Sequence, residues 1–133
     1  MLMAGLLLLS LVLGQTEPAE DTMDVSSKIR DLQAERVKLL ERGMELVSMA
    51  YAEGSCDFTS VFKLQLELLD AKLDTAASKE EEIAVLSSQL EVANQTHEMA
   101  RQRYENGSVS QLDVIQAKSV ALRIEIELLK RKR

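Results

Sequence analysis

Tyr51-Ala52-Glu53-Gly54-Ser55 is matched, 53 residues further along the chain, by Tyr104-Glu105-Asn106-Gly107-Ser108. Each copy lies between long stretches of helix-forming residues that contain no proline. We interpret each copy as the end of a helix, a glycine in the left-handed conformation, and the start of the next helix. Because such a repeated unit defines the architecture, we expect the chain to reverse direction at residues 51–57 and again at residues 104–110.

The composition favours helices throughout. Apolar residues make up 46% of the chain and aromatic residues only 3%, with no Trp and a single Pro. The runs of β-branched and aromatic residues that a sandwich or barrel needs are missing, whereas Leu, Ala, Glu, Lys and Gln suit long helices. We therefore predict an all-α fold of elongated antiparallel helical hairpins, or a coiled coil, with three long helices.

Apolar residues follow the alternating three- and four-residue spacing of a coiled-coil seam in each helical stretch. The first stretch carries Val37, Leu40, Met44, Val47 and Tyr51. The middle stretch carries Phe62, Leu66, Leu69, Leu73, Ala76, Ile83 and Leu90. The last stretch carries Ile115, Ser119, Leu122, Ile126 and Leu129. We expect each helix to pack against a partner helix along these positions.

The middle stretch, residues 58–104, has one place where it could break. Ser78 and Glu81 fit the pattern of a capping box, which marks the start of a helix, as Ser110 and Asp113 do at the start of the last helix. The stretch contains neither Gly nor Pro, so we favour a continuous helix with the two end helices laid one after the other along it. A break near Ser78 would instead give four helices, with both glycine corners at the same end.

The beginning of the chain is predicted to be a signal peptide. Residues 1–14 are apolar and Leu-rich, too few to span a bilayer but suited to a signal sequence cleaved after Gly14. A retained amphipathic start is the alternative. We expect a polar linker at residues 15–24 and an antiparallel helical coiled-coil domain at residues 25–133, its first helix beginning near Asp24 or Ser26.

The residues that usually carry enzyme chemistry are missing from the sequence. His97 is the only histidine and Cys56 the only cysteine, and they are too far apart in the sequence to suggest a metal site. The sequence contains no nucleophile motif and no glycine-rich phosphate loop. The net charge of −6 disfavours nucleic acid as a partner. We predict a protein that is not an enzyme and that binds no cofactor, metal or nucleic acid.

The second corner and the helix after it carry a family resemblance. Residues 103–118 read R-Y-E-N-G-S-V-S-Q-L-D-V-I-Q-A-K. This resembles the R-Y-x-x-G-x-x-S-x-x-D-V-L-x-A-x segment of the TolC-like outer membrane efflux proteins. The first copy keeps Tyr51, Gly54 and Val61 but has Ser60 and Leu64 where the family has Asp and Ala. The resemblance is confined to the helical hairpin and tip repeat of that family.

In that family the segment forms the periplasmic tip of an α-helical tunnel, which docks on the helical hairpins of an adaptor protein. The resemblance implies an exported helical module, in the periplasm or associated with the outer membrane, that joins proteins within or beside an efflux or transport assembly. Contact with the membrane would be only indirect. The residues expected to bind the partner at the two corners are Tyr51, Gly54, Ser55, Tyr104, Gly107, Ser108, Val109 and Asp113.

Two alternatives remain open at this stage. Tyr51 and Tyr104 also fit a purely structural role, in which each closes the end of a hairpin. The whole chain also fits an exported coiled-coil scaffold or spacer that forms a homo-oligomer, with Leu69 and Leu73 as seam positions whose replacement by Asp would disrupt the assembly.

Overall fold

The structure is a computed structural model that describes residues 2–54 and 57–133, with side chains from Asp24 onward. The chain divides into two units, one ending at Ala34 and the other running from Glu35 to Arg133. Helix α1 (Leu2–Ala52) forms the first unit and continues into the second. It begins well before Asp24 and is helical through residues 15–24, where the sequence predicts a linker. The side chains of the expected signal peptide lie outside the described part, and its cleavage stays a prediction.

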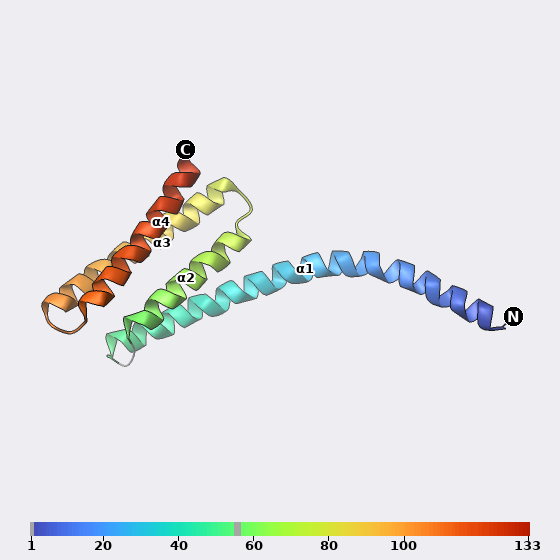
Figure 1. Cartoon of the computed structure of the whole chain (residues 1–133), viewed down its shortest axis with the longest axis horizontal. Coiled ribbons are helices and arrows are strands. Elements are labelled where there is room, and N and C mark those ends of the chain that lie inside the picture. Colours follow the sequence, from blue (N-terminus) through green and yellow to red (C-terminus); the bar gives the residue numbers. More distant parts are fainter. Residues whose placement is uncertain (1, 55–56) are drawn as a thin grey trace. The chain divides into compact units, whose positions relative to one another are not determined.

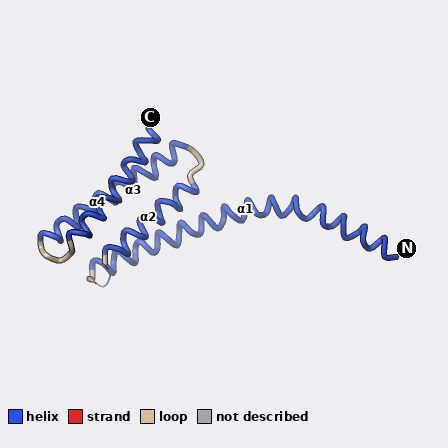
Figure 2. Tube along the Cα trace, viewed as in Figure 1, coloured by secondary structure: helices blue, strands red, loops and turns tan. Residues whose placement is uncertain are grey.

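The second unit contains the end of α1 together with α2 (Phe58–Thr75), α3 (Lys79–Glu105) and α4 (Gln111–Lys132). Successive helices run in opposite directions and are joined by short connections (Figures 1 and 2). Over the residues that the structure describes, every regular element is a helix. The predicted all-α antiparallel fold is therefore confirmed.

The expectation of a continuous middle helix is wrong, and the alternative break near Ser78 is confirmed. Ala76 and Ser78 have extended backbones, so α2 ends at Thr75 and α3 begins at Lys79. The Ser78 side chain accepts a hydrogen bond from the Glu81 backbone N–H at 3.1 Å. In return the Glu81 carboxylate accepts one from the Ala77 backbone N–H at 2.7 Å. These bonds satisfy N–H groups around the start of α3, whose first-turn acidic residues also suit the helix dipole.

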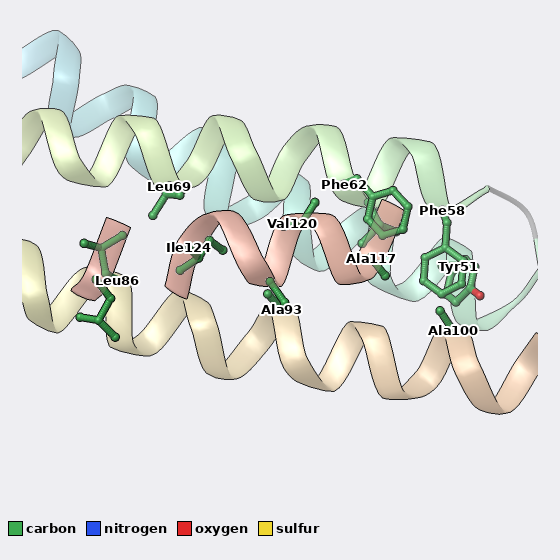
Figure 3. Close-up of a cluster of buried hydrophobic side chains, with 13 residues drawn as sticks. Tyr51, Phe58, Phe62, Leu69, Leu86, Ala93, Ala100, Ala117, Val120 and Ile124 are labelled. Carbon is green, nitrogen blue, oxygen red and sulfur yellow. The ribbon is translucent and has the colours of Figure 1, made fainter. Parts of the chain in front are cut away.

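Folding back at this break closes the hydrophobic core between the helices. Phe58, Leu86 and Ile124 have the largest fully buried side chains. Small residues line the facing sides of α3 and α4, which lets these two helices approach closely (Figure 3). The small buried residues are Ala93 and Ala100 on α3 and Ala117 and Ala121 on α4.

The predicted seams are confirmed in α1 and α2. The α1 seam is partly buried along its length and ends in the buried Tyr51. On α2, Phe62 and Leu69 are buried, while Leu66 and Leu73 are partly buried against the core. Leu69 and Leu73 therefore pack against the core within the chain.

As the face that packs within the chain, the predicted seam of α4 is wrong. Ile115, Leu122, Ile126 and Leu129 are exposed. The face that packs against the other helices is formed instead by Ala117, Val120, Ala121, Ile124 and Leu128. On α3, Ile83 and Leu90 lie at the edge of the core, and Leu86, Ala93 and Ala100 form the buried line. The helices meet through their smaller residues, which permit closer backbone approach than a Leu and Ile stripe does.

Candidate protein-docking end

The first corner joins α1 to α2. Gly54 has φ +79°, the left-handed conformation expected from the sequence. Its N–H donates to the Tyr51 carbonyl at 3.0 Å, so the last turn of α1 is closed by this bond. Asp57 is the N-cap of α2 and accepts a hydrogen bond from the Ser60 backbone N–H at 3.3 Å. Ser55, one of the predicted partner-binding residues, lies outside the described residues.

The second corner joins α3 to α4 and ends α3 in a Schellman motif. Gly107 has φ +77°, and its N–H donates to the Tyr104 carbonyl at 3.0 Å. The Ser108 N–H donates to the Arg103 carbonyl at 2.8 Å. Helix α4 then starts with the predicted capping box. The Ser110 hydroxyl accepts from the Asp113 N–H, and the Asp113 carboxylate accepts from the Ser110 N–H, both at 3.2 Å.

The two corners lie at the same end of the second unit (Figure 1). The Arg103 guanidinium stands 4.1 Å from the centre of the Tyr51 ring, which joins the end of α3 to the end of α1. The Tyr51 ring in turn packs on Phe58, with ring centres 4.2 Å apart, and Phe58 stacks on Phe62 at 5.3 Å. A cation over an aromatic face stabilises by about 0.5–2 kcal/mol, depending on how far it is desolvated. This cluster holds the corners side by side.

The predicted partner-binding residues divide into buried and exposed groups. Tyr51 is 7% exposed and lies in the core, which favours its hairpin-closing role. Tyr104 is 46% exposed and presents its side chain to solvent. Val109 is partly buried against the core, and Asp113 is engaged in the cap of α4. Among these side chains, Tyr104 is therefore the one best placed to meet a partner.

A cavity of about 120 Å³ lies beside the aromatic cluster, between α1, α2 and α3. Met44 and Met99 contribute to its wall, and methionine side chains adapt readily to different shapes. Gln65, which is buried, donates from Nε2 to the Thr96 hydroxyl at 2.8 Å. Its Oε1 has no hydrogen-bond partner within the part of the chain that the structure describes. The cavity thus combines apolar side chains with this acceptor of Gln65 and with the polar side chains of Ser48, Thr96 and Arg103.

Three residues of this end were not predicted from the sequence: Arg103, Phe58 and Gln65. Arg103 is the first residue of the segment that carries the family resemblance, and it lies one residue before the repeated corner pattern begins at Tyr104. Phe58 is the first residue after an N-cap and could have been recognised as a residue that covers the hairpin end. The burial of Gln65 could not be predicted from the sequence. This residue has the helical spacing of the buried apolar residues, but its own polar side chain does not indicate burial.

The ion pairs near the end of α3 are formed by exposed side chains. Arg101 donates to both carboxylate oxygens of Glu98, at 3.1 and 2.8 Å, and to Glu105 at 2.6 Å. The hydrogen bond from Arg101 lowers the pKa of Glu98 below its ordinary value, and the pKa of Arg101 is raised in return. These pairs reinforce the last turns of α3 without creating a reactive group.

Over the described residues, no three His, Cys, Asp or Glu side chains come together in a way that could hold a metal ion. Within the same residues, no helix has both the length and the apolar character needed to cross a membrane.

No protein-family model matches the chain, and the searches of curated proteins and of solved structures likewise found no match. The resemblance to the TolC-like family therefore stays a prediction from residues 103–118 and their weaker repeat.

Proposed function

We propose that this chain is an exported helical module, not an enzyme, whose corner end docks a helical protein partner within or beside an efflux or transport assembly. The corner end comprises residues 53, 54, 57 and 106–110 with the turns of helix that flank them. The proposed partner of the chain is an adaptor-like helical hairpin in the periplasm. Contact with the outer membrane would come through that assembly.

The observation that carries the proposal is the pairing of the two glycine corners at one end of the bundle. The Arg103 guanidinium and the Tyr51 ring meet at 4.1 Å, so the end of α3 and the end of α1 that lead into the two corners are held together. A pre-organised surface loses less conformational entropy on binding than two independent loops would lose. Two matched corners side by side suit a partner that is itself a hairpin with two matched ends.

An exposed aromatic side chain at the second corner supplies contact area. Tyr104 is 46% exposed and lies three residues before Gly107. Aromatic residues are over-represented among the residues that dominate binding energy at protein interfaces. The cavity beside Phe58 could also accept a side chain from the partner, with Gln65 Oε1 as an acceptor for its hydrogen-bond donor.

The test uses a photo-crosslinking amino acid placed at Asn106 of the full chain in a Gram-negative host, with a second variant that carries it at Glu80. Both residues are exposed, but Glu80 lies at the start of α3, away from the corners. Crosslinks to one periplasmic protein from Asn106 and none from Glu80 would support docking through the corner end. Equal crosslinking from both positions, or none from Asn106, would contradict it.

The recovered partner is then purified, and its affinity is measured for Tyr104→Ser against the control Leu39→Ser. Leu39 is also large, apolar and exposed, but it lies on α1. We expect Tyr104→Ser to weaken binding by about tenfold or more, as for a central interface residue, and Leu39→Ser to leave it unchanged. Tyr104 is preferred to Gly107 and Val109, because Gly107 has a positive φ and Val109 packs on the core.

Export is tested separately by cell fractionation and N-terminal sequencing of the mature protein. We expect the chain in the periplasmic or outer-membrane fraction, with Gln15 as its first residue. Recovery of an uncleaved chain from the cytoplasm would contradict export and leave the docking surface to be judged on the crosslinking alone.

A further inference from the structure

Helix α4 is apolar on two opposite faces. Its inner face packs in the core, with Ile124 only 2% exposed. Its outer stripe is defined by five large apolar side chains that are 45–61% exposed: Leu112, Ile115, Leu122, Ile126 and Leu129. At about 100° per residue, the centres of the two faces lie about 160° apart around the helix. A helix that is apolar on both sides is normally covered on both sides.

The outer stripe has the spacing of a coiled-coil seam. With Ser119 it follows an alternation of three and four residues from Leu112 to Leu129, without interruption. This is the pattern that places every stripe residue against a neighbouring helix. Over about 26 Å of helix, the pattern has no partner helix among the described residues of the second unit, since these side chains are exposed there.

The charges beside the stripe indicate which partner fits. In a coiled coil, the residues that flank the seam set the choice and direction of the partner. Lys118 and Glu125 flank the stripe on one side, each directly before a seam position, and Arg123 and Lys130 flank it on the other side, each directly after one. Lys118, Arg123 and Glu125 are all exposed. The described residues provide no ion pair for Lys118 or Glu125.

Two copies of α4 can be compared in both directions. If they ran parallel, Lys118 of each copy would face Arg123 of the other and Glu125 would face Lys130, so two like-charge contacts would cancel two opposite-charge contacts. If they ran antiparallel, Lys118 of each copy would face Glu125 of the other, giving two opposite-charge contacts and no like-charge contact. In that arrangement Ser119 of one copy faces Leu122 of the other, so a small residue accommodates a large one at the centre.

We propose that the outer stripe of α4 binds the outer stripe of a second copy of this chain, antiparallel, about a two-fold axis between Ser119 and Leu122. The contact is the same surface on both copies, so it closes as a dimer and does not propagate. Its central contacts lie on α4 away from the corner connections, and the inference does not depend on the proposed docking function.

Sedimentation equilibrium of the full chain over a range of concentrations tests the dimer. Leu122→Glu buries a charge in the seam and should raise the dimer dissociation constant by at least about tenfold. Leu39→Glu, at an exposed position on α1, is the matched control and should leave it unchanged. Both sites are exposed, and unchanged helicity by circular dichroism confirms that each variant is folded.

Lys118→Glu tests the direction of pairing. In the antiparallel dimer it places a carboxylate against Glu125 of the other copy and should weaken association about fivefold at low salt, an effect that shrinks as salt is added. In a parallel dimer the same change would face Arg123 and strengthen association. Combining Lys118→Glu with Glu125→Lys restores the antiparallel pairs and should return the affinity to that of the parent chain.

A chain that is monomeric at every concentration would overturn the proposal. So would a dimer that Leu122→Glu leaves intact, because the contact would then lie on another surface. Stronger association of Lys118→Glu would overturn the antiparallel direction. If the chain dimerises but Asn106 gives no crosslinks, the docking function is refuted and the α4 contact is retained. If Asn106 gives crosslinks but the chain stays monomeric, the α4 contact is refuted and the docking function is retained.

Discussion

Replacing three glycines with alanine should change stability in opposite directions, because the structure gives them different backbones. Gly54 and Gly107 have φ values of +79° and +77°, and an added Cβ would meet no atom within 4 Å at either site. Gly43 lies inside α1, where an added Cβ would come 3.6 Å from Leu64 Cδ2, an ordinary contact. The two corner sites thus test backbone conformation alone, free of steric clash.

The expected magnitudes follow from these geometries. Alanine in the left-handed conformation costs about 1–2 kcal/mol, so Gly54→Ala and Gly107→Ala should each lower the free energy of unfolding by that amount. Alanine inside a helix is better than glycine by about 0.5–1 kcal/mol, so Gly43→Ala should raise the free energy of unfolding. The difference between Gly43→Ala and Gly107→Ala should therefore be about 1.5–3 kcal/mol.

Urea unfolding followed by far-ultraviolet circular dichroism measures these differences, at one fixed protein concentration because dimerisation would add to stability. Gly107→Asn is the matched control, since asparagine tolerates the left-handed conformation and should lose less than alanine. If Gly107→Ala were as stable as the parent, residue 107 would not be left-handed, and the Schellman geometry of the second corner would be refuted. Loss of stability in Gly43→Ala would show instead that α1 does not pack on α2 as described.

Three further predictions concern the core and the surface. Leu86→Ala removes a fully buried side chain and should lower the free energy of unfolding by about 2–5 kcal/mol, whereas Leu39→Ala at an exposed site should change it by less than about 0.5 kcal/mol in chemical denaturation. Gln65→Met removes the acceptor Oε1, which has no partner among the described residues, together with the Nε2 donor that bonds Thr96, whereas Gln65→Met with Thr96→Val removes both ends of that bond. The melting temperature of the double variant should equal or exceed that of Thr96→Val alone; a marked fall below it would mean that Oε1 is satisfied. The hydrogen bond from Arg101 lowers the pKa of Glu98, so the stabilisation from this pair is present above the ordinary carboxyl pKa and is lost as pH falls through the lowered pKa. NMR titration should find the pKa of Glu98 below 4.5 in the parent chain and closer to 4.5 in Arg101→Gln.

The repeated corners were predictable because glycine in a left-handed turn leaves a local signature. Gly54 and Gly107 each follow a helix, and the residues after them supply an N-cap, so neither feature depends on distant contacts. The capping box at Ser110 was predicted for the same reason. Local chemistry at a helix end is decided within a few residues, and sequence alone resolves it.

The break at Ser78 was visible in the sequence but was outweighed by the lack of Gly and Pro. Ser78 and Glu81 carried the correct signal, and Glu80 to Glu82 strengthened it as first-turn acidic residues. What the sequence could not show is the packing gained when α3 folds back and buries Leu86. Tertiary burial therefore favoured a break that local propensity left undecided.

The docking end was only partly predictable. Both glycine corners were located from sequence, but their adjacency depends on the break, which was not the favoured alternative. The contact between Arg103 and Tyr51 joins residues far apart in the chain, and no local pattern indicates it. The sequence also could not show that Tyr51 is buried and Tyr104 exposed, because both residues lie three positions before the glycine of a corner.

The error on α4 has a specific physical origin. Two stripes on this helix carry apolar residues, and the outer one has the more regular seam spacing and the larger side chains. The chain uses the other stripe for its own core, because Ala117 and Ala121 allow close approach to the alanines of α3. A seam pattern predicts a partner helix without saying whether that helix belongs to the same chain. The unused seam from Leu112 to Leu129 thus retains its prediction of a partner, and the charges of Lys118 and Glu125 make a second, antiparallel copy the partner that fits.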